Sequence, residues 1–474
     1  AWVYESGWLA QLIEGVLASP LIRTRSFAEH HADHATRGIV YLPTTSYIEM
    51  NEWTLPPAAA LRYAALVSAE KAAGSYERHK PFIRGGIWRN FFTRYPESNW
   101  MHKRMLDLSA RHAMWLEAGR TAEEKAELQE LLHRTQANDA YWHGLFGGLY
   151  LPHLRRAIWN HLIALEAALD RDLPRPSFER RDLDLDGREE LILHNAELQA
   201  ILRNDGDACV IELAAYALAH NFADTLRRYA EGYHHKFVAS PHAGSPTEAG
   251  AAEDHSDPAL QRGEGSALQL DEGPASAHDR VAFKHIIEPG DTQPDTRPRA
   301  ICVDTLLDPE GSRLAIDNYR PIAATAKALA FSAECGGGRI EKRYQLHGPD
   351  LTVRYRCEGL QGCRIEIQLN LAMPSCDGYS GRYILADGGI PCGFGEALSL
   401  DELSEIVLED DELRGRLKLR VDRPVCLHAT PFFTASQSEA GFEKIMQAAC
   451  VTLAWDPASA KETLTLMFTV IPFT

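Results

Sequence analysis

The segment from Asn138 to Tyr150 contains the side chains best suited to binding chemistry. Asp139, Trp142 and His143 fall within five residues and are followed by three glycines. A sugar ring needs flat aromatic surfaces for its C–H faces and charged or amide groups for its hydroxyls. Trp142 offers the first and Asp139 and His143 offer the second, so the segment predicts a saccharide site. Composition alone also fits, and favours, a helix cap at Asp139 with Trp142 in a core.

A second group of candidates follows the β-rich run Gly38–Leu42. In a βα barrel, the loop after a strand lies on the catalytic face, which would bring Glu49, Glu52 and Trp53 to a sugar subsite. The alternative is a solvated acidic loop with Trp53 packed on Pro56. Without further information the residues favour this alternative.

A third segment, Arg84–Asn99, carries several arginines among aromatic residues. Guanidinium groups bind carboxylates in a bidentate manner and can hold neighbouring loops together. We therefore expect these arginines to organise the site and not to take part in the chemistry directly.

The elements that would position these residues follow from the periodicity of apolar side chains. Residues 1–36 predict one or two amphipathic helices, and a capping box at Thr121 and Glu124 begins a later one. Further helices are expected at Ala58–Ala73, Asn99–Ala118, Thr121–Gln136 and Tyr150–Asp170. After Pro174-Arg175-Pro176, alternating runs predict strands at Glu190–His194, Cys209–Leu213, Leu351–Cys357, Arg364–Leu371, Leu417–Val421 and Leu464–Val470.

This pattern predicts a multidomain α+β chain. Residues 1–55 are expected to be the last elements of a βα barrel, residues 56–175 a helical bundle, and residues 176–474 an all-β sandwich. Residues from about 239 to 295 are rich in Ala, Gly, Ser, Pro and acids, so we expect a mobile insertion there.

Composition narrows the range of partners. The net charge of −17 repels phosphate backbones and anionic lipids, so neither nucleic acid nor a membrane is expected as a partner. The nine cysteines are odd in number and include no CxxC pair, which favours free thiols in a reducing cytoplasm. Clustered zinc ligands are absent from the sequence, and no metal or cofactor is expected.

Several long motifs, in order, resemble glycoside hydrolase family 57 of the α-amylase/4-α-glucanotransferase type. They are WVYESGWL (Trp2–Leu9), YLPTTSYIEMNEW (Tyr41–Trp53), GGIWRNFFTRYPESNWMHKRM (Gly85–Met105), NDAYWHGLFGGLYLPHLR (Asn138–Arg155), DLDGREELILHN (Asp184–Asn195) and SQSEAGFEKIMQ (Ser436–Gln447). The resemblance implies a (β/α)7-type barrel remnant, a helical bundle and a galactose-mutarotase-like sandwich. It also favours a homodimer.

The resemblance implies retaining chemistry on α-1,4-glucans or maltooligosaccharides, performed by a Glu nucleophile and an Asp acid/base. Both would precede Trp2, so this chain resembles the C-terminal portion of such an enzyme and is expected to be inactive alone. The resemblance implies that Asp139, Trp142 and His143 bind substrate or support the groups that do, and that Trp53, with Glu49 and Glu52 less surely, lines a substrate subsite. Two alternatives are a non-catalytic carbohydrate-binding or assembly protein that has lost its barrel, and a scaffold with no sugar role.

Overall fold

The computed structural model describes residues 3–42, 44, 46–144, 146–234, 283–326, 328–376, 380–438 and 441–473. The chain divides into two compact units, residues 1–46 and 47–474. The first holds α1 (Trp8–Ala18) and α2 (Phe27–Asp33), and neither helix has a buried residue. Ser26 and Glu29 form a capping box at the start of α2.

The strand expected at Gly38–Leu42 is absent, because these five residues are irregular and exposed. An isolated apolar run has no partner with which to form the hydrogen bonds of a strand. Contacts divide the chain after residue 46, and the domain boundary at residue 55 stays a prediction. Helix α3 (Ile48–Trp53) belongs to the second unit, where Met50 is buried against Phe91 and Tyr95.

Helices dominate the second unit up to residue 172. Their bounds follow the expected segments closely, and Pro occupies the first turn of three of them, where its missing N–H costs nothing. They are α4 (Pro57–Ala72), α5 (Tyr76–His79), α6 (Asn90–Arg94), α7 (Pro96–Leu116), α8 (Ala122–Thr135) and α9 (Pro152–Asp172). The capping box expected at Thr121 and Glu124 begins α8.

The strands form one antiparallel hydrogen-bonded network with two arms. One arm has the order β8-β9-β10-β11-β17 and the other β1-β2-β3-β4-β6-β12-β16, and β15 pairs with both β17 and β16. The bounds are β1 (Phe178–Arg181), β2 (Glu190–His194), β3 (Leu198–Leu202), β4 (Val210–Ala215), β5 (His220–Asn221), β6 (Ile301–Leu307), β7 (Arg313–Ala315), β8 (Arg320–Thr325), β9 (Ala328–Cys335), β10 (Gly338–His347), β11 (Asp350–Glu358), β12 (Arg364–Leu371), β13 (Gly381–Leu385), β14 (Leu398–Asp410), β15 (Gly415–Ser438), β16 (Gly441–Trp455) and β17 (Lys461–Pro472).

Strand β15 changes partners along its length. Residues 415–421 pair with β17, and residues 426–438 pair with β16. Pro424, which has no backbone N–H to donate, lies between the two pairings. Apolar side chains from both arms, such as Val353, Leu369 and Phe468, pack into a single core.

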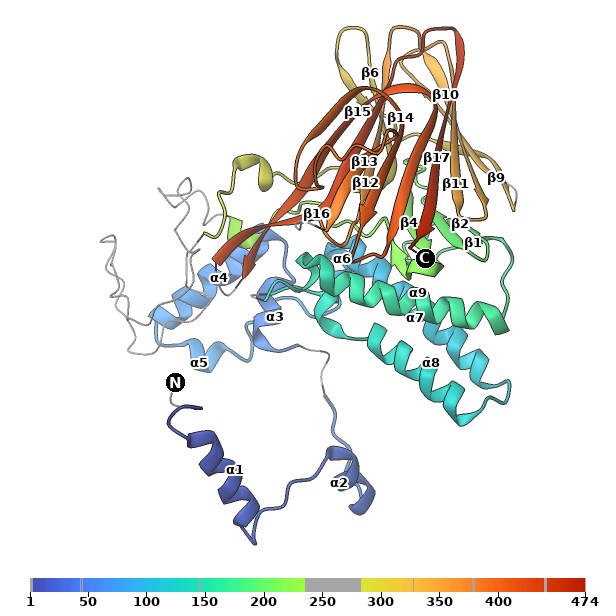
Figure 1. Ribbon diagram of the computed structural model, residues 1–474. Helices are drawn as coiled ribbons and strands as arrows, with labels where there is room; N and C mark the ends of the chain where they lie inside the picture. The colour runs from blue at the N-terminus through green and yellow to red at the C-terminus, as the bar shows by residue number, and fades with distance from the viewer. Residues whose placement is uncertain are drawn as a thin grey trace. The chain divides into compact units, whose positions relative to one another are not determined.

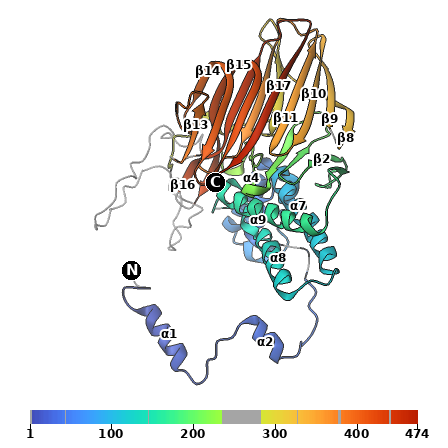
Figure 2. The ribbon, with the colours of Figure 1, turned by 45° about the vertical axis from the view of Figure 1, so that its right-hand side comes forward.

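Helices α7 and α9 cover the outer face of strands β2 to β4. Leu191 and Leu193 face the core between the arms, whereas Ile192 packs with Trp100 and Trp159 of the helices. These strands are therefore buried on both faces. Figure 1 and Figure 2 show α7, α8 and α9 gathered at one end of the long strands.

A buried ionic network joins these helices to the strands. We call Arg104, Arg111, Glu166, Gln199 and Glu212 the Arg104 cluster. Arg104 Nε lies 3.0 Å from Glu212 Oε2 and its Nη2 lies 2.7 Å from Glu166 Oε2. Gln199 donates to both carboxylates, at 3.0 and 2.8 Å, and Arg111 Nη1 lies 3.4 Å from Glu166 Oε1. All five polar side chains thus have partners in a dry interface, as buried charges require.

The end of the expected mobile insertion is also corrected. Phe283 packs on Phe442, and Arg228 and Arg299 form ion pairs with Asp295. Residues 283–295 are therefore anchored, and residues 239–282 lie outside the described part of the chain. All nine cysteines are free thiols.

Candidate functional site

The segment around Trp142 folds into two short 3₁₀ turns, η1 (Asn138–Tyr141) and η2 (Gly148–Tyr150). Leu149 N donates to Trp142 O at 2.7 Å and closes the loop between them. Gly148 has a φ of 51°, and a Cβ there would lie 2.1 Å from Trp142 O and 2.8 Å from Asp139 O. The loop therefore requires glycine at this position.

A cavity of about 140 Å³ opens at this loop and is lined by Asp139, Trp142 and His143 with Gly144, Phe146, Gly148 and Leu154. Asp139 is exposed and Trp142 is half-buried. The indole of Trp142 packs edge-on against Phe91, with ring centroids 6.2 Å apart, and its Nε1 has no acceptor within the described residues. The cavity thus combines an exposed carboxylate with an aromatic ring, and the Trp142 N–H is a buried donor without an acceptor among the described residues.

Behind the cavity lies a buried group of hydrogen-bonded side chains, Arg94, Tyr95, His143, Tyr150 and Glu231, which we call the Glu231 cluster. The hydroxyls of Tyr95 and Tyr150 both donate to Glu231 Oε1 at 2.6 Å, and Arg94 forms an ion pair with Oε2. Tyr95 Oη also lies 2.6 Å from His143 Nε2. One carboxylate therefore organises side chains from three separate segments.

The cluster sets the protonation state of His143. Because the proton of Tyr95 goes to Glu231, the Nε2 atom of His143 must carry the hydrogen of the remaining bond. Burial, with the positive charges of Arg94 and His234, lowers the pKa of His143 well below its ordinary value. Burial and the negative charge of Glu231 raise the pKa values of Tyr95 and Tyr150 well above theirs. All three rings are thus neutral near pH 7.

Three long side chains attach the cluster to its surroundings. Arg94 Nη1 donates to the carbonyl oxygens of Trp53 at 2.8 Å and Leu55 at 2.9 Å, which holds the end of α3. Arg155 of α9 donates to Leu149 O at 2.5 Å. Gln447 of β16 donates to Tyr150 O at 2.8 Å. Helices and strands therefore fix the loop together.

The structure brings together most of the residues predicted to bind a saccharide. Asp139, Trp142 and His143 line one cavity, and Trp53 packs edge-on against His143 with ring centroids 5.5 Å apart. Glu52 is exposed on α3 and does not line the cavity. Glu49 lies on the same helix, and its side chain is outside the described set.

Of the two roles expected for His143, the structure favours support of the site over direct contact with substrate. Its side chain is 1% exposed and its Nε2 is engaged by Tyr95, so it supports the cavity wall and is not an open polar contact. Sequence reasoning missed Tyr95, Tyr150 and Glu231. The only sequence signal for Glu231 is a lone acid in the aromatic and basic segment Arg227–His234, and this says nothing of its distant partners.

Three carboxylates between β1 and the start of β2 could hold a metal ion. Oxygen atoms of Asp182, Asp184 and Glu190 lie within 4.8 Å of one another. Such oxygen ligands suit a hard cation such as Ca²⁺. The expectation that no metal would bind was based on the absence of clustered zinc ligands, and it did not take these three acids into account. In the described part of the chain, no helix is both long and apolar enough to cross a bilayer.

Two family models match the chain. The model described as "Alpha-amylase/4-alpha-glucanotransferase, C-terminal" matches residues 182–469, and the corresponding middle-domain model matches residues 86–169. The 4-alpha-glucanotransferase of Thermococcus litoralis is 31% identical over 95% of this chain and 63% of its own length. The alpha-amylase of Pyrococcus furiosus is 32% identical over 94% of this chain and 61% of its own.

A solved structure is also similar. The crystal structure of the 4-alpha-glucanotransferase from Thermococcus litoralis aligns with a TM-score of 0.68 and 26% identity, over 99% of this chain and 64% of that chain. This chain therefore spans less than two thirds of the length of these relatives.

Proposed function

Because the chain belongs to the α-amylase/4-α-glucanotransferase family, we propose that it forms part of a retaining enzyme that acts on α-1,4-glucans. The family match confirms the resemblance to glycoside hydrolase family 57 noted in the sequence. The activity, the substrate and any partner of the whole protein are part of the proposal.

One observation carries this proposal: the cavity that joins Asp139 to the Trp142 ring. Sugar hydroxyls would donate to the exposed Asp139 carboxylate, and a pyranose face would contact the indole. The Glu231 cluster would keep the cavity wall rigid. A fixed wall lowers the entropy cost of binding a flexible oligosaccharide.

The same cavity supports a non-catalytic role for these residues. A retaining glycosidase needs two carboxylates about 5 Å apart. Asp139 is the one carboxylate among the described residues that line the cavity. Glu231 is occupied by Arg94 and two tyrosines. We therefore expect the 474 residues alone to leave maltotriose unchanged, and any disproportionation detected by chromatography would contradict this division of roles.

We also propose that the first unit, residues 1–46, packs against elements of the βα barrel of the whole enzyme. Leu21, Phe27 and Ile39 are 94%, 97% and 89% exposed, and apolar surface of this kind is normally covered. Hydrogen exchange on the isolated chain should show little protection of the amides at Gly38–Leu42. Strong protection in a monomer would contradict this part of the proposal.

Calorimetric titration with maltoheptaose tests the glucan site. Asp139→Asn should weaken binding at this cavity about tenfold, the loss expected for one charge-assisted hydrogen bond. Trp142→Phe keeps an aromatic ring of smaller area, and should weaken binding by a smaller factor. Asp401→Asn, at an exposed acid of β14, is the matched control and should bind like the unaltered chain. Equal affinities for all four proteins would refute the assignment.

A further inference from the structure

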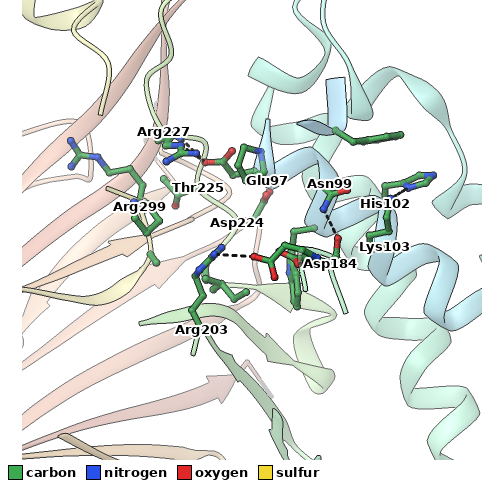
Figure 3. Close-up of a pocket in the computed structure, with 18 of the residues that line it drawn as sticks. Glu97, Asn99, His102, Lys103, Asp184, Arg203, Asp224, Thr225, Arg227 and Arg299 are labelled. Carbon is green, nitrogen blue, oxygen red and sulfur yellow. Dashed lines mark hydrogen bonds and ion pairs between the residues drawn. The ribbon is translucent and has the colours of Figure 1, made fainter. Parts of the chain in front are cut away.

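A second and larger cavity lies between helix α7 and the strands. Its volume is about 960 Å³, at the upper end of the range for small-molecule sites. It shares no lining residue with the cavity at Trp142. Figure 3 shows Asn99, His102 and Lys103 on its helical side and Arg203, Arg227 and Arg299 on the strand side. The proposed function makes no use of it.

Two buried donors in the wall of this cavity have no acceptor in the described part of the chain. Asn221, which is 1% exposed, accepts from the backbone N–H groups of Leu213 and Ala223 through Oδ1, so its Nδ2 is left unpaired. Trp159, which is 2% exposed, likewise has an unpaired Nε1. A buried donor without an acceptor carries a free-energy cost, which the oxygen atom of a ligand that reached the donor would remove.

The charges of the cavity favour a neutral ligand. Five acidic and five basic residues line it, and three of its four arginines form ion pairs. Arg227 Nε lies 3.5 Å from Glu97 Oε1, and Arg203 forms an ion pair with Asp205. Burial and the charge of Lys103 lower the pKa of His102 to about 4, so this ring adds no charge near pH 7. Because five acidic side chains offset these cations, an anion such as phosphate is not favoured here.

Aromatic rings complete the cavity. Phe92 and His102 are half-buried and stacked, with ring centroids 4.2 Å apart, and Trp88 and Trp100 also line the wall. Rings of this kind offer the flat apolar surface that the C–H face of a sugar needs. Aromatic surface and buried donors without acceptors among the described residues are features that this cavity shares with the first one.

We propose that this cavity is a second saccharide site, which binds a neutral oligosaccharide segment apart from the site at Trp142. The choice of an α-1,4-glucan as its ligand rests on the proposed function. Binding here would attach the protein to a long glucan while another part of the same chain occupies the first cavity. The two sites would then raise each other's effective ligand concentration.

Calorimetric titration of the full chain with maltoheptaose, together with crystals soaked in maltotriose, tests the second site. We expect two molecules of maltoheptaose per chain and electron density for sugar beside Phe92. Phe92→Leu should weaken one class of sites about tenfold, the loss of one aromatic stacking contact. Phe433→Leu, at a half-buried phenylalanine of β15 outside both cavities, is the matched control and should bind both molecules.

Cross-variants separate this inference from the proposed function. Asp139→Asn should weaken binding at the first class of sites and leave the second class intact. Asn221→Asp keeps the oxygen that accepts from the backbone N–H groups of Leu213 and Ala223, and it removes Nδ2. This variant should weaken the second class and leave the first class intact. A single site lost on Asp139→Asn, with no sugar beside Phe92, would overturn the second site alone. A single site lost on Phe92→Leu would overturn the first and support the second. Binding of inorganic phosphate in place of sugar would also contradict the inference.

Discussion

The second unit contains two buried polar clusters, and they are built differently. In the Arg104 cluster two arginines face two carboxylates, with Gln199 between the acids, and Arg175 adds a third cation 3.2 Å from Glu166 Oε1. In the Glu231 cluster a single carboxylate receives two tyrosine hydroxyls and one arginine, and a neutral histidine lies alongside. The first balances charge inside a scaffold. The second orders neutral rings beside an open cavity, which marks it as support for a binding site.

The largest effect should come from removing the central cation of the Arg104 cluster. Arg104→Met leaves Glu166 and Glu212 buried with less compensation, so the free energy of unfolding should fall by about 3–5 kcal/mol. Urea unfolding measures this loss. Maltoheptaose affinity of the folded fraction should be unchanged, because neither acid lines the cavity at Trp142.

The double variant Arg104→Met/Glu166→Gln should regain part of that stability, since it removes one of the uncompensated charges. If instead Arg104→Met lowered glucan affinity while the protein stayed fully folded, the distinction between a scaffold cluster and a site cluster would fail.

A smaller effect is expected when one hydroxyl of the Glu231 cluster is removed. Tyr95→Phe leaves His143 and Glu231 each without one partner, which should cost about 1–3 kcal/mol of unfolding free energy. Glucan affinity should fall as well, because His143 forms the cavity wall. Tyr383→Phe is the matched control: this buried hydroxyl has no partner among the described residues, so its removal should be nearly neutral.

The smallest effect concerns pH. Because the native pKa of His143 lies below its ordinary value, the unfolded chain takes up this proton first as the pH falls below about 6.5. Acidification from pH 7 to pH 6 should therefore lower stability, and His143 should account for less than about 1 kcal/mol. His143→Gln should reduce the pH dependence of the free energy of unfolding, measured by urea unfolding at several pH values. His428→Gln, at an exposed histidine of β15, should leave it unchanged.

Local signals predicted the regular elements well. The expected strand Arg364–Leu371 matches β12, and the capping box at Thr121 begins α8. Such signals lie within a few residues of chain. The strand expected at Gly38–Leu42 was wrong, because a segment of β-rich composition forms a strand only when it has a pairing partner.

The site was only partly predictable for the same physical reason. Asp139 and Trp142 stand in one short segment, so their types and spacing were visible together. Glu231 lies 136 residues from Tyr95 and 81 from Tyr150, and no local pattern reveals contacts at that distance. Its burial follows from how the helices meet the strands, which is a property of the whole fold.

The passage of β15 from one arm to the other has a mechanical consequence. Its residues 415–421 are bonded to β17, and residues 426–438 to β16, within one uninterrupted strand. Stretching the chain cannot separate the arms without also breaking the hydrogen bonds of this strand. A pulling experiment on this part of the molecule should therefore record one force peak for the two arms together, and not a separate rupture for each.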